Sequence, residues 1–397
     1  MIVAIYIIYT LGFWVFGHML DMPGDTEGFY APVAESLAKG DGYTIDGKFA
    51  TSYPPLYPLL LASIYIFTGE YGTTNIVYPY CTIFLQSFSC GLLFLIANLL
   101  FHKRIAFLAS MMYAAYPFFV ILSVTKYTWV AMPLFTALFF ISLFIFIIAC
   151  REHRMVAFAL SGFSLGLSGL VWPAVLFLWI PMSIFGVISV TKSGRKNGGI
   201  KIILCFVLSY WIPVLLWSAI IYQNTGQVIL LSNNQVVATR DGIFHREGSQ
   251  LREYEFAQDA YSAMKNGGMN NMKDIMKFCV DETSQKPAAA ISFAAFKLFR
   301  PWYGTDSERY ELPILMIQLP YLLIGMYGFY VARRKNLFAT YLSLTIVLYF
   351  WFVSFTVLSI LRYMLSAMGI VIMFCAVGIE DLIPRMKRLV IKEIPPS

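Results

Sequence analysis

The sequence predicts an all-α polytopic membrane protein with about ten transmembrane helices, interfacial helices and a small helical lobe outside the bilayer. Of its 397 residues, 59% are hydrophobic, 17% are aromatic and only 13% are charged. That composition is too apolar for a protein whose whole surface faces water. Apolar runs of roughly 17–25 residues, each long enough to cross about 30 Å of hydrocarbon, recur along most of the chain.

The apolar runs define the predicted spans in chain order. They are residues 1–20, 76–101, 105–124, 128–149, 155–171, 174–190, 200–223, 312–332, 337–358 and 363–382. A tight turn at Trp172 and Pro173 separates the fifth span from the sixth. The first run lacks a basic leader and a small-residue cleavage site, so we expect a retained span rather than a removed signal peptide.

The basic residues of the short loops predict the orientation, because cytoplasmic loops carry an excess of Lys and Arg. With a cytoplasmic N-terminus, the inner side holds Lys103, Arg104, Arg151, Arg154, Lys192, Arg195, Lys196, Lys201, Arg333, Arg334, Lys335 and the basic tail 385–392. The outer short loops hold Lys39, Lys48, Lys126 and Arg362. The net charge of +7 is therefore a topology signal, and no basic stripe interleaved with aromatic residues indicates nucleic-acid binding.

This topology predicts three segments in a multi-pass protein of the inner (plasma) membrane. Residues 1–223 form an N-terminal membrane module whose first outer loop is 21–75, residues 224–311 form an extracytoplasmic helical lobe, and residues 312–397 form the last membrane helices and a basic cytoplasmic tail. Helical runs near 254–265 and 271–279 flank a Gly-Gly pair in the lobe. The stretch "SGFSLGLSG", 161–169, predicts a close helix contact.

The first outer loop is acidic and is predicted to hold two helices. Its acidic residues are Asp21, Asp25, Glu27, Glu35, Asp41, Asp46 and Glu70. Apolar residues recur at helical spacing from Tyr30 to Ala38, with Pro32 in the first turn and Gly40 as a C-cap. The stretch "SYPPLYPLLLASIYIFTG", 52–69, supplies about 13 apolar residues, which is short for a crossing, so it predicts a second interfacial helix.

The ordered pattern of this loop resembles the GT-C superfamily of membrane glycosyltransferases. It is most similar to bacterial and archaeal members of the protein-mannosyltransferase and aminoarabinose-transferase type. The matching residues are Asp25, Tyr30, Ala34, Leu37, Gly40, Gly42, Tyr43, Pro54, Pro55, Leu56 and Tyr57. "RPWYG", 300–304, and the Arg362-Tyr363 start of the last span are similar to later parts of the family pattern. The resemblance therefore extends over nearly the whole chain.

Two positions depart from the family pattern. The family's usual second acidic residue, in the outer loop between the third and fourth spans, is missing, since that loop reads Thr125-Lys126-Tyr127-Thr128. Tyr53 stands before Pro-Pro-Leu, where the aminoarabinose branch has a Lys, which argues against lipid A as the acceptor. The missing second acidic residue leaves open a non-catalytic member of the family that serves as a partner subunit.

The resemblance implies an inverting transfer of sugar from a polyprenyl-phosphate carrier to an extracytoplasmic acceptor, which could be a protein, a lipid or a glycan. Such a reaction needs a carboxylate to accept the acceptor's proton and cations to hold the departing phosphate. Asp25 is the predicted base and Glu27 a second candidate, although Asp25 could instead be a helix N-cap and Glu27 a solvated first-turn acid. The matches at Tyr30, Tyr57 and Tyr363 imply substrate binding.

The predicted phosphate ligands are Lys126, Arg300 and Arg362, each at the outer end of a span. The alternative for each is a cation that reaches the lipid headgroups. Trp172, Trp302 and Tyr303 are predicted anchors at the membrane boundary. Further partners are the bilayer itself and an unknown acceptor.

The sequence predicts no cofactor, disulfide framework or nucleic-acid partner. The four histidines show no metal spacing, and a two-carboxylate cation site from Asp25 and Glu27 has no third ligand. The six cysteines form no CxxC motif. A transporter or lipid flippase is the rival function, but transporters place charge or broken helices near the bilayer midplane. Here the polar residues gather outside the spans.

Overall fold

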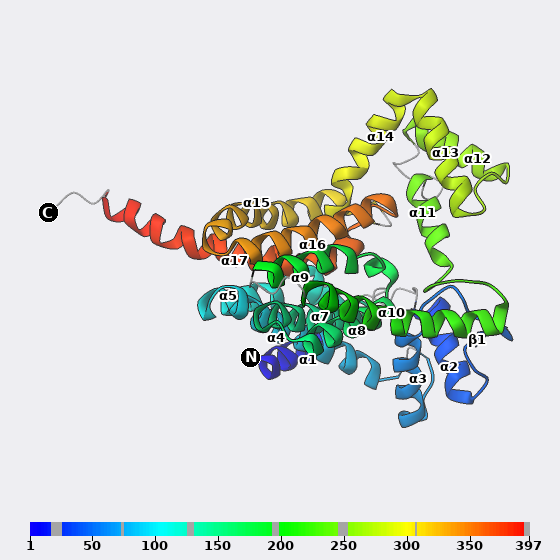
Figure 1. Cartoon of the computed structure of the whole chain (residues 1–397), viewed down its shortest axis with the longest axis horizontal. Helices are drawn as coiled ribbons and strands as arrows, with labels where there is room; N and C mark the ends of the chain where they lie inside the picture. The colour runs from blue at the N-terminus through cyan, green and yellow to red at the C-terminus, as the bar shows by residue number, and fades with distance from the viewer. Residues whose placement is uncertain are drawn as a thin grey trace. The chain divides into compact units, whose positions relative to one another are not determined.

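The computed structural model describes residues 1–16, 26–72, 75–124, 131–192, 198–244, 253–305 and 308–392. The chain divides into two compact units. The first unit comprises Met1–Ser232, Ile324–Thr345 and Gly369–Ser397, and the second comprises Asn233–Leu323 and Ile346–Met368. Helices dominate both units (Figure 1), which confirms the predicted all-α membrane fold.

Six helices of the described chain are long and apolar enough to cross a bilayer. They are α4 (Val77–Leu100), α7 (Ala131–Glu152), α10 (Gly198–Thr225), α15 (Glu311–Lys335), α16 (Leu337–Thr356) and α17 (Leu361–Lys392). Shorter apolar helices are α1 (Ile2–Phe16), α3 (Leu56–Thr68), α8 (Met155–Gly169) and α9 (Trp179–Lys192). Nine of these ten helices match predicted spans, and the tenth, α3, matches the predicted second helix of the first loop. The predicted span 105–124 has no single matching helix.

The predicted span 105–124 is instead two helices, α5 (Lys103–Ala114) and α6 (Pro117–Val124). Pro117 has no N–H to donate to the preceding turn, so a straight helix cannot continue through it without losing a hydrogen bond. The backbone N–H of Tyr116 donates to the carbonyl of Tyr113 at 3.2 Å, which tightens the last turn of α5. The break therefore follows from one residue inside an otherwise uniform apolar run.

Close contacts between helices of the first unit depend on small residues. A Cβ on Gly162 or Gly166 of α8 would overlap the carbonyl oxygen of Phe206 or Tyr210 on α10. The α8 helix also packs against α7, where the Ser142 hydroxyl donates to the carbonyl of Ser161 at 2.9 Å. The close helix contact predicted for residues 161–169 is thus confirmed. In the same unit, α15 and α17 lie side by side at Gly325 and Gly328 (Figure 1).

The first loop folds into short elements on the first unit. A π-helical turn, Thr26–Tyr30, leads into α2 (Ala31–Lys39), and a hairpin of β1 (Thr44–Ile45) and β2 (Lys48–Phe49) precedes α3. Gly40 ends α2 with φ of 88°, a left-handed conformation that glycine adopts without steric cost. Both helices and the C-cap are as predicted, whereas the π-helical turn and the hairpin are additional.

The second unit contains the helical lobe, which we define as α11 (Asn234–Phe244), α12 (Glu255–Lys265), α13 (Met272–Gln285) and α14 (Pro287–Phe299). Its core stacks Phe256 on Phe293, with ring centroids 5.2 Å apart, and buries Ile275 from α13. Lys286 ties α14 to α12 through Asp259 at 2.5 Å and Glu255 at 3.0 Å. The lobe thus has an apolar core of its own, closed by a surface ion-pair cluster.

Candidate active site

The predicted base and one predicted phosphate ligand, Asp25 and Lys126, lie outside the described residues, so their roles stay predictions. After residues 1–16, the described chain resumes at Thr26, the residue directly after Asp25. The π-helical turn that begins there contains the second candidate acid, Glu27, which is exposed. A π-helical turn fits one extra residue into a helix and occurs often at functional sites.

The π-helical turn is held by its two ends, Thr26 and Tyr30, which are 6% and 8% exposed. The Tyr30 ring meets the rings of Tyr57 and Tyr53 edge to face, at centroid distances of 4.9 and 4.8 Å. Such pairs contribute about 0.5–1.5 kcal/mol beyond their burial. Glu27 and the rest of the turn between these ends face outward, so the aromatic contacts fix a turn that presents an acid.

Tyr57, a predicted substrate ligand, is 2% exposed, and its hydroxyl donates to the Tyr78 hydroxyl of α4 at 3.0 Å. Burial raises the pKa of the Tyr57 hydroxyl well above its ordinary value, so this group stays protonated and can donate. Tyr30 and Tyr57 therefore contact each other and the body of the first unit. Their predicted contact with substrate is not tested by this arrangement.

The Pro-Pro segment of the first loop is fixed by a second aromatic group. The Tyr43 hydroxyl donates to the carbonyls of Tyr53 and Pro54 at 3.0 and 3.2 Å. The Tyr43 ring lies 5.0 Å from the ring of Trp217 on α10, whose Nε1 donates to the Leu231 carbonyl at 3.0 Å. Tyr43, just before the hairpin, thus connects the first loop to α10, which gives the described part of this loop a defined fold despite its polar composition.

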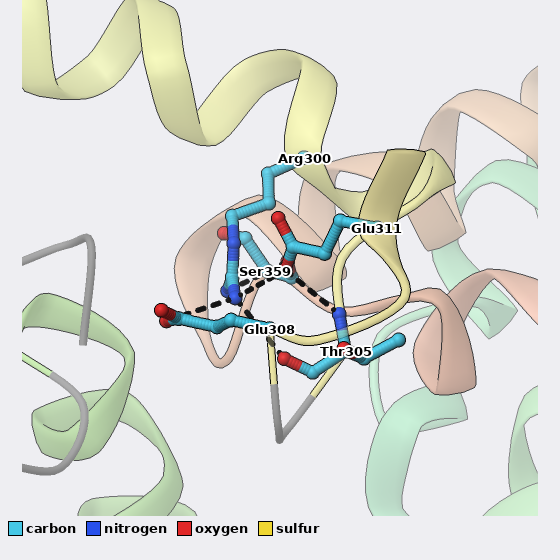
Figure 2. Close-up of polar contacts among 5 residues, drawn as sticks. All are labelled: Arg300, Thr305, Glu308, Glu311 and Ser359. Carbon is cyan, nitrogen blue, oxygen red and sulfur yellow. Dashed lines mark hydrogen bonds and ion pairs between the residues drawn. The ribbon is translucent and has the colours of Figure 1, made fainter. Parts of the chain in front are cut away.

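Arg300 is fully buried in the second unit and bound by carboxylates (Figure 2). Its Nη2 donates to Oε1 of Glu311 at 2.7 Å and to Oε1 of Glu308 at 3.3 Å, and its Nη1 donates to the Ser359 carbonyl at 3.3 Å. The same Glu311 oxygen accepts from the backbone N–H of Thr305 at 3.0 Å. The Nη2 of Arg300, the group nearest these carboxylates, is therefore already engaged within the protein.

Arg362 and Tyr363, the other predicted ligands of the second unit, lie in the first turn of α17. Both are partly exposed, and the Arg362 guanidinium is 5.6 Å from the centre of the Tyr363 ring. A guanidinium has planar N–H donors whose geometry suits bidentate contact with a phosphate. Trp302, a predicted anchor at the membrane boundary, is instead buried and packs on Trp351, with ring centroids 5.5 Å apart.

Sequence reasoning missed Lys297 and Glu311, two buried charges close to Arg300 in the chain. Lys297 is 4% exposed, and its Nζ donates to the carbonyls of Gly242 and Val357 at 2.7 and 3.1 Å. A single cation in the apolar stretch "AAAISFAAFKLF", 288–299, was the signal that could have indicated a buried contact. Within the described chain, no group of three or more His, Cys, Asp or Glu residues could hold a metal ion.

Solved structures of other membrane proteins have a fold similar to that of this chain. The archaeal oligosaccharyltransferase AglB from Archaeoglobus fulgidus, in complex with an inhibitory peptide and a dolichol-phosphate, is 12% identical with a TM-score of 0.55, over 100% of this chain and 52% of that chain. Its apo form is 13% identical with a TM-score of 0.54, over 98% and 51%. This chain therefore spans about half the length of these enzymes and shares their GT-C fold.

Part of the chain also matches the model of a protein family. Residues 52–217, less than half of the chain, match the family of dolichyl-phosphate-mannose-protein mannosyltransferases. Together with the fold, this match confirms the resemblance to GT-C membrane glycosyltransferases. ArnT from Cupriavidus metallidurans bound to undecaprenyl phosphate is 12% identical with a TM-score of 0.45, over 100% of this chain and 81% of that chain. A sequence search of curated proteins gives no match.

Proposed function

We propose that this protein is an inverting glycosyltransferase that moves a sugar from a polyprenyl-phosphate carrier to an acceptor on the extracytoplasmic side of the membrane. One observation carries the proposal: the whole chain shares the fold of an oligosaccharyltransferase that was solved with dolichol-phosphate. The family match over residues 52–217 supports a carrier of the same chemical kind. The acceptor, whether a protein, a lipid or a glycan, is left open.

The proposed reaction forms a bond from an acceptor hydroxyl or amine to the anomeric carbon while the bond to the carrier phosphate breaks on the opposite face. Asp25 accepts the acceptor's proton, and Glu27 is the alternative base. The departing polyprenyl phosphate gains negative charge, which a guanidinium stabilises by charge-assisted hydrogen bonds. Arg362 is the proposed ligand for that charge, because Arg300 already binds two carboxylates. Lys126 stays a further candidate.

The test of the base is Asp25→Asn in the full-length protein. Asparagine keeps the size and a capping oxygen but cannot accept a proton at neutral pH, so it separates catalysis from helix capping. We expect sugar transfer to fall about 10²–10⁴-fold, with normal membrane insertion and normal donor binding. Purified protein is supplied with a panel of polyprenyl-phosphate sugars, and release of polyprenyl phosphate is measured.

Glu27→Gln is measured beside Asp25→Asn, since Glu27 is the alternative base, an exposed acid two residues along the same chain. Transfer by Asp25→Asn within a few-fold of the parent would exclude Asp25 as the base and move the role to Glu27. If the parent transfers sugar from none of the donors but still binds polyprenyl phosphate, the non-catalytic subunit replaces the proposed enzyme. Movement of the intact polyprenyl-phosphate sugar across the membrane of a vesicle, without release of the sugar, would instead establish a flippase.

A further inference from the structure

The turn before the last helix, Val357–Ile360, is held by side chains from the end of the lobe. Lys297 and Arg300 lie three residues apart and point toward this turn from α14 and the short 3₁₀ turn after it, Arg300–Trp302. Lys297 Nζ donates to the Val357 carbonyl at 3.1 Å, and Arg300 Nη1 donates to the Ser359 carbonyl at 3.3 Å. Two buried basic side chains therefore bind the carbonyls of Val357 and Ser359, which lie two residues apart in one short turn.

Backbone contacts complete this attachment. The N–H of Leu361, the first residue of α17, donates to the Gly304 carbonyl at 2.8 Å. A Cβ on Gly304 would lie only 2.6 Å from the Ser359 carbonyl oxygen, so a side chain there would force the two segments apart. The first backbone N–H of α17 is thus satisfied by a carbonyl from the 300–304 segment rather than by solvent.

Glu311 fixes the direction of the Arg300 side chain. Its Oε1 accepts from Nη2 of Arg300 and from the N–H of Thr305, so the guanidinium is bound by both Glu311 and the Ser359 carbonyl (Figure 2). A buried guanidinium with a carboxylate and carbonyl partners has little freedom to reorient. Arg300 therefore transmits the positions of Thr305 and Glu311 to the residues that begin α17.

We propose that Arg300 and Glu311 form a positioning pair that sets the first turn of α17 and thereby aims Arg362 at the phosphate of a polyprenyl carrier. The inference rests on the proposed function, because that function names the carrier. Arg362 follows the Ser359 carbonyl by three residues and the Leu361 N–H by one, so a shift of the turn moves its guanidinium directly. A displacement of about 1 Å is enough to reduce catalysis about 10²-fold.

The variant Glu311→Gln separates this role from direct phosphate binding by Arg300. If Arg300 bound phosphate itself, loss of the competing carboxylate would release its guanidinium, and carrier affinity would stay equal or rise. If Arg300 acts through Arg362, the same variant loosens the turn and weakens binding. The two roles thus predict opposite changes in one measured dissociation constant.

The experiment measures binding of undecaprenyl phosphate to the full-length protein in lipid nanodiscs. We expect Arg362→Gln and Glu311→Gln each to raise Kd about tenfold or more. The double variant should bind the carrier no more weakly than Arg362→Gln alone, because the effects of substitutions at coupled residues are not additive. Arg300→Lys should give an intermediate Kd, since it keeps the charge without the fork. Lys277→Gln, an exposed cation of the lobe, is the control and should leave Kd unchanged.

Additive losses, or a Kd for Glu311→Gln at or below the parent's, would overturn the positioning role while the proposed function stands. A parent that binds no undecaprenyl phosphate would instead remove the proposed carrier and this inference together. Should Glu311→Gln fail to fold, Arg300→Met combined with Glu311→Leu removes both charges at once, which buried pairs often tolerate. Under the positioning role this pair still raises Kd, and an unchanged Kd contradicts it.

Discussion

Lys297 is a lysine of the lobe that is buried, and its burial carries an electrostatic cost. Burial is the main cause that lowers its pKa to about 7; Cys279 opposes this shift and the Arg300 charge adds to it. Its neutral amine still has two N–H groups, which suffice for the carbonyls of Gly242 and Val357. The contact therefore does not depend on the charge, although the stability of the fold does.

We predict that Lys297→Met flattens the dependence of unfolding on pH. Between about 7 and 10.5, the unfolded chain binds a proton at Lys297 that the folded chain lacks, so the free energy of unfolding rises with pH across this window. Below about 7 both states are protonated and the burial cost is complete. The parent's unfolding free energy should gain up to about 1.4 kcal/mol per pH unit relative to the variant.

Thermal unfolding in detergent micelles from about pH 7 to 10 measures this difference. Lys265→Met, which removes an exposed lysine of the same lobe, is the matched control and should follow the parent. If the curves of the parent and Lys297→Met stay parallel across the window, Lys297 keeps its ordinary ionisation and the burial argument is wrong.

At the scale of elements, the α8–α10 contact shows why small residues recur in an apolar span. Gly162 and Gly166 let the α10 backbone approach closely, with no room for a Cβ. We predict that Gly162→Ala lowers the free energy of unfolding by about 1–3 kcal/mol, the usual cost of overpacking, despite the better helix propensity of alanine. Gly199→Ala is the control, because its Cβ would make only ordinary contacts at 3.8 and 4.0 Å.

Denaturant or thermal melts of the purified variants test this contact. Equal stability of Gly162→Ala and Gly199→Ala would mean that α8 and α10 can separate at no cost, contrary to the packing described here. A rise in stability for Gly199→Ala alone agrees with helix propensity acting where space is free.

Elements with a periodic or compositional signal were predictable from the sequence, and elements set by tertiary contacts were not. The α2 helix, its Gly40 cap and the short α3 helix follow from local patterns. The π-helical turn at Thr26–Tyr30 depends on Tyr53 and Tyr57, more than twenty residues along the chain. Likewise, nothing in the sequence around Arg300 indicates that Glu311 binds it. The sequence therefore predicts Arg300 as a phosphate ligand, and the ion pair with Glu311 becomes visible only in the structure.

For the molecule as a whole, the orientation in the membrane rests on loop charge. We predict that a cysteine at Thr283 in the lobe is labelled by an impermeant thiol reagent on intact cells, whereas one at Glu152, beside Arg151, is not. Both positions are exposed in the structure, so access by the reagent depends on the side of the membrane. A background without the six native cysteines is required.

Permeabilised cells should label both positions, which controls for the reactivity of each thiol. Labelling of Glu152→Cys but not Thr283→Cys on intact cells would reverse the topology and would place the first loop on the cytoplasmic side. That result would contradict transfer to an extracytoplasmic acceptor even if the enzyme proved active.

The attachment of the Val357–Ile360 turn also has a consequence for the order of assembly during synthesis. Lys297 and Arg300 precede the carbonyls they bind by 60 and 59 residues. Because the chain emerges from its N-terminus, the lobe can fold around its own apolar core while the ribosome is still making α16. When α17 is made, the residues that bind the turn before it are already folded. Its start is selected by a surface already in place, so a lobe that folds late would delay the final step of biogenesis.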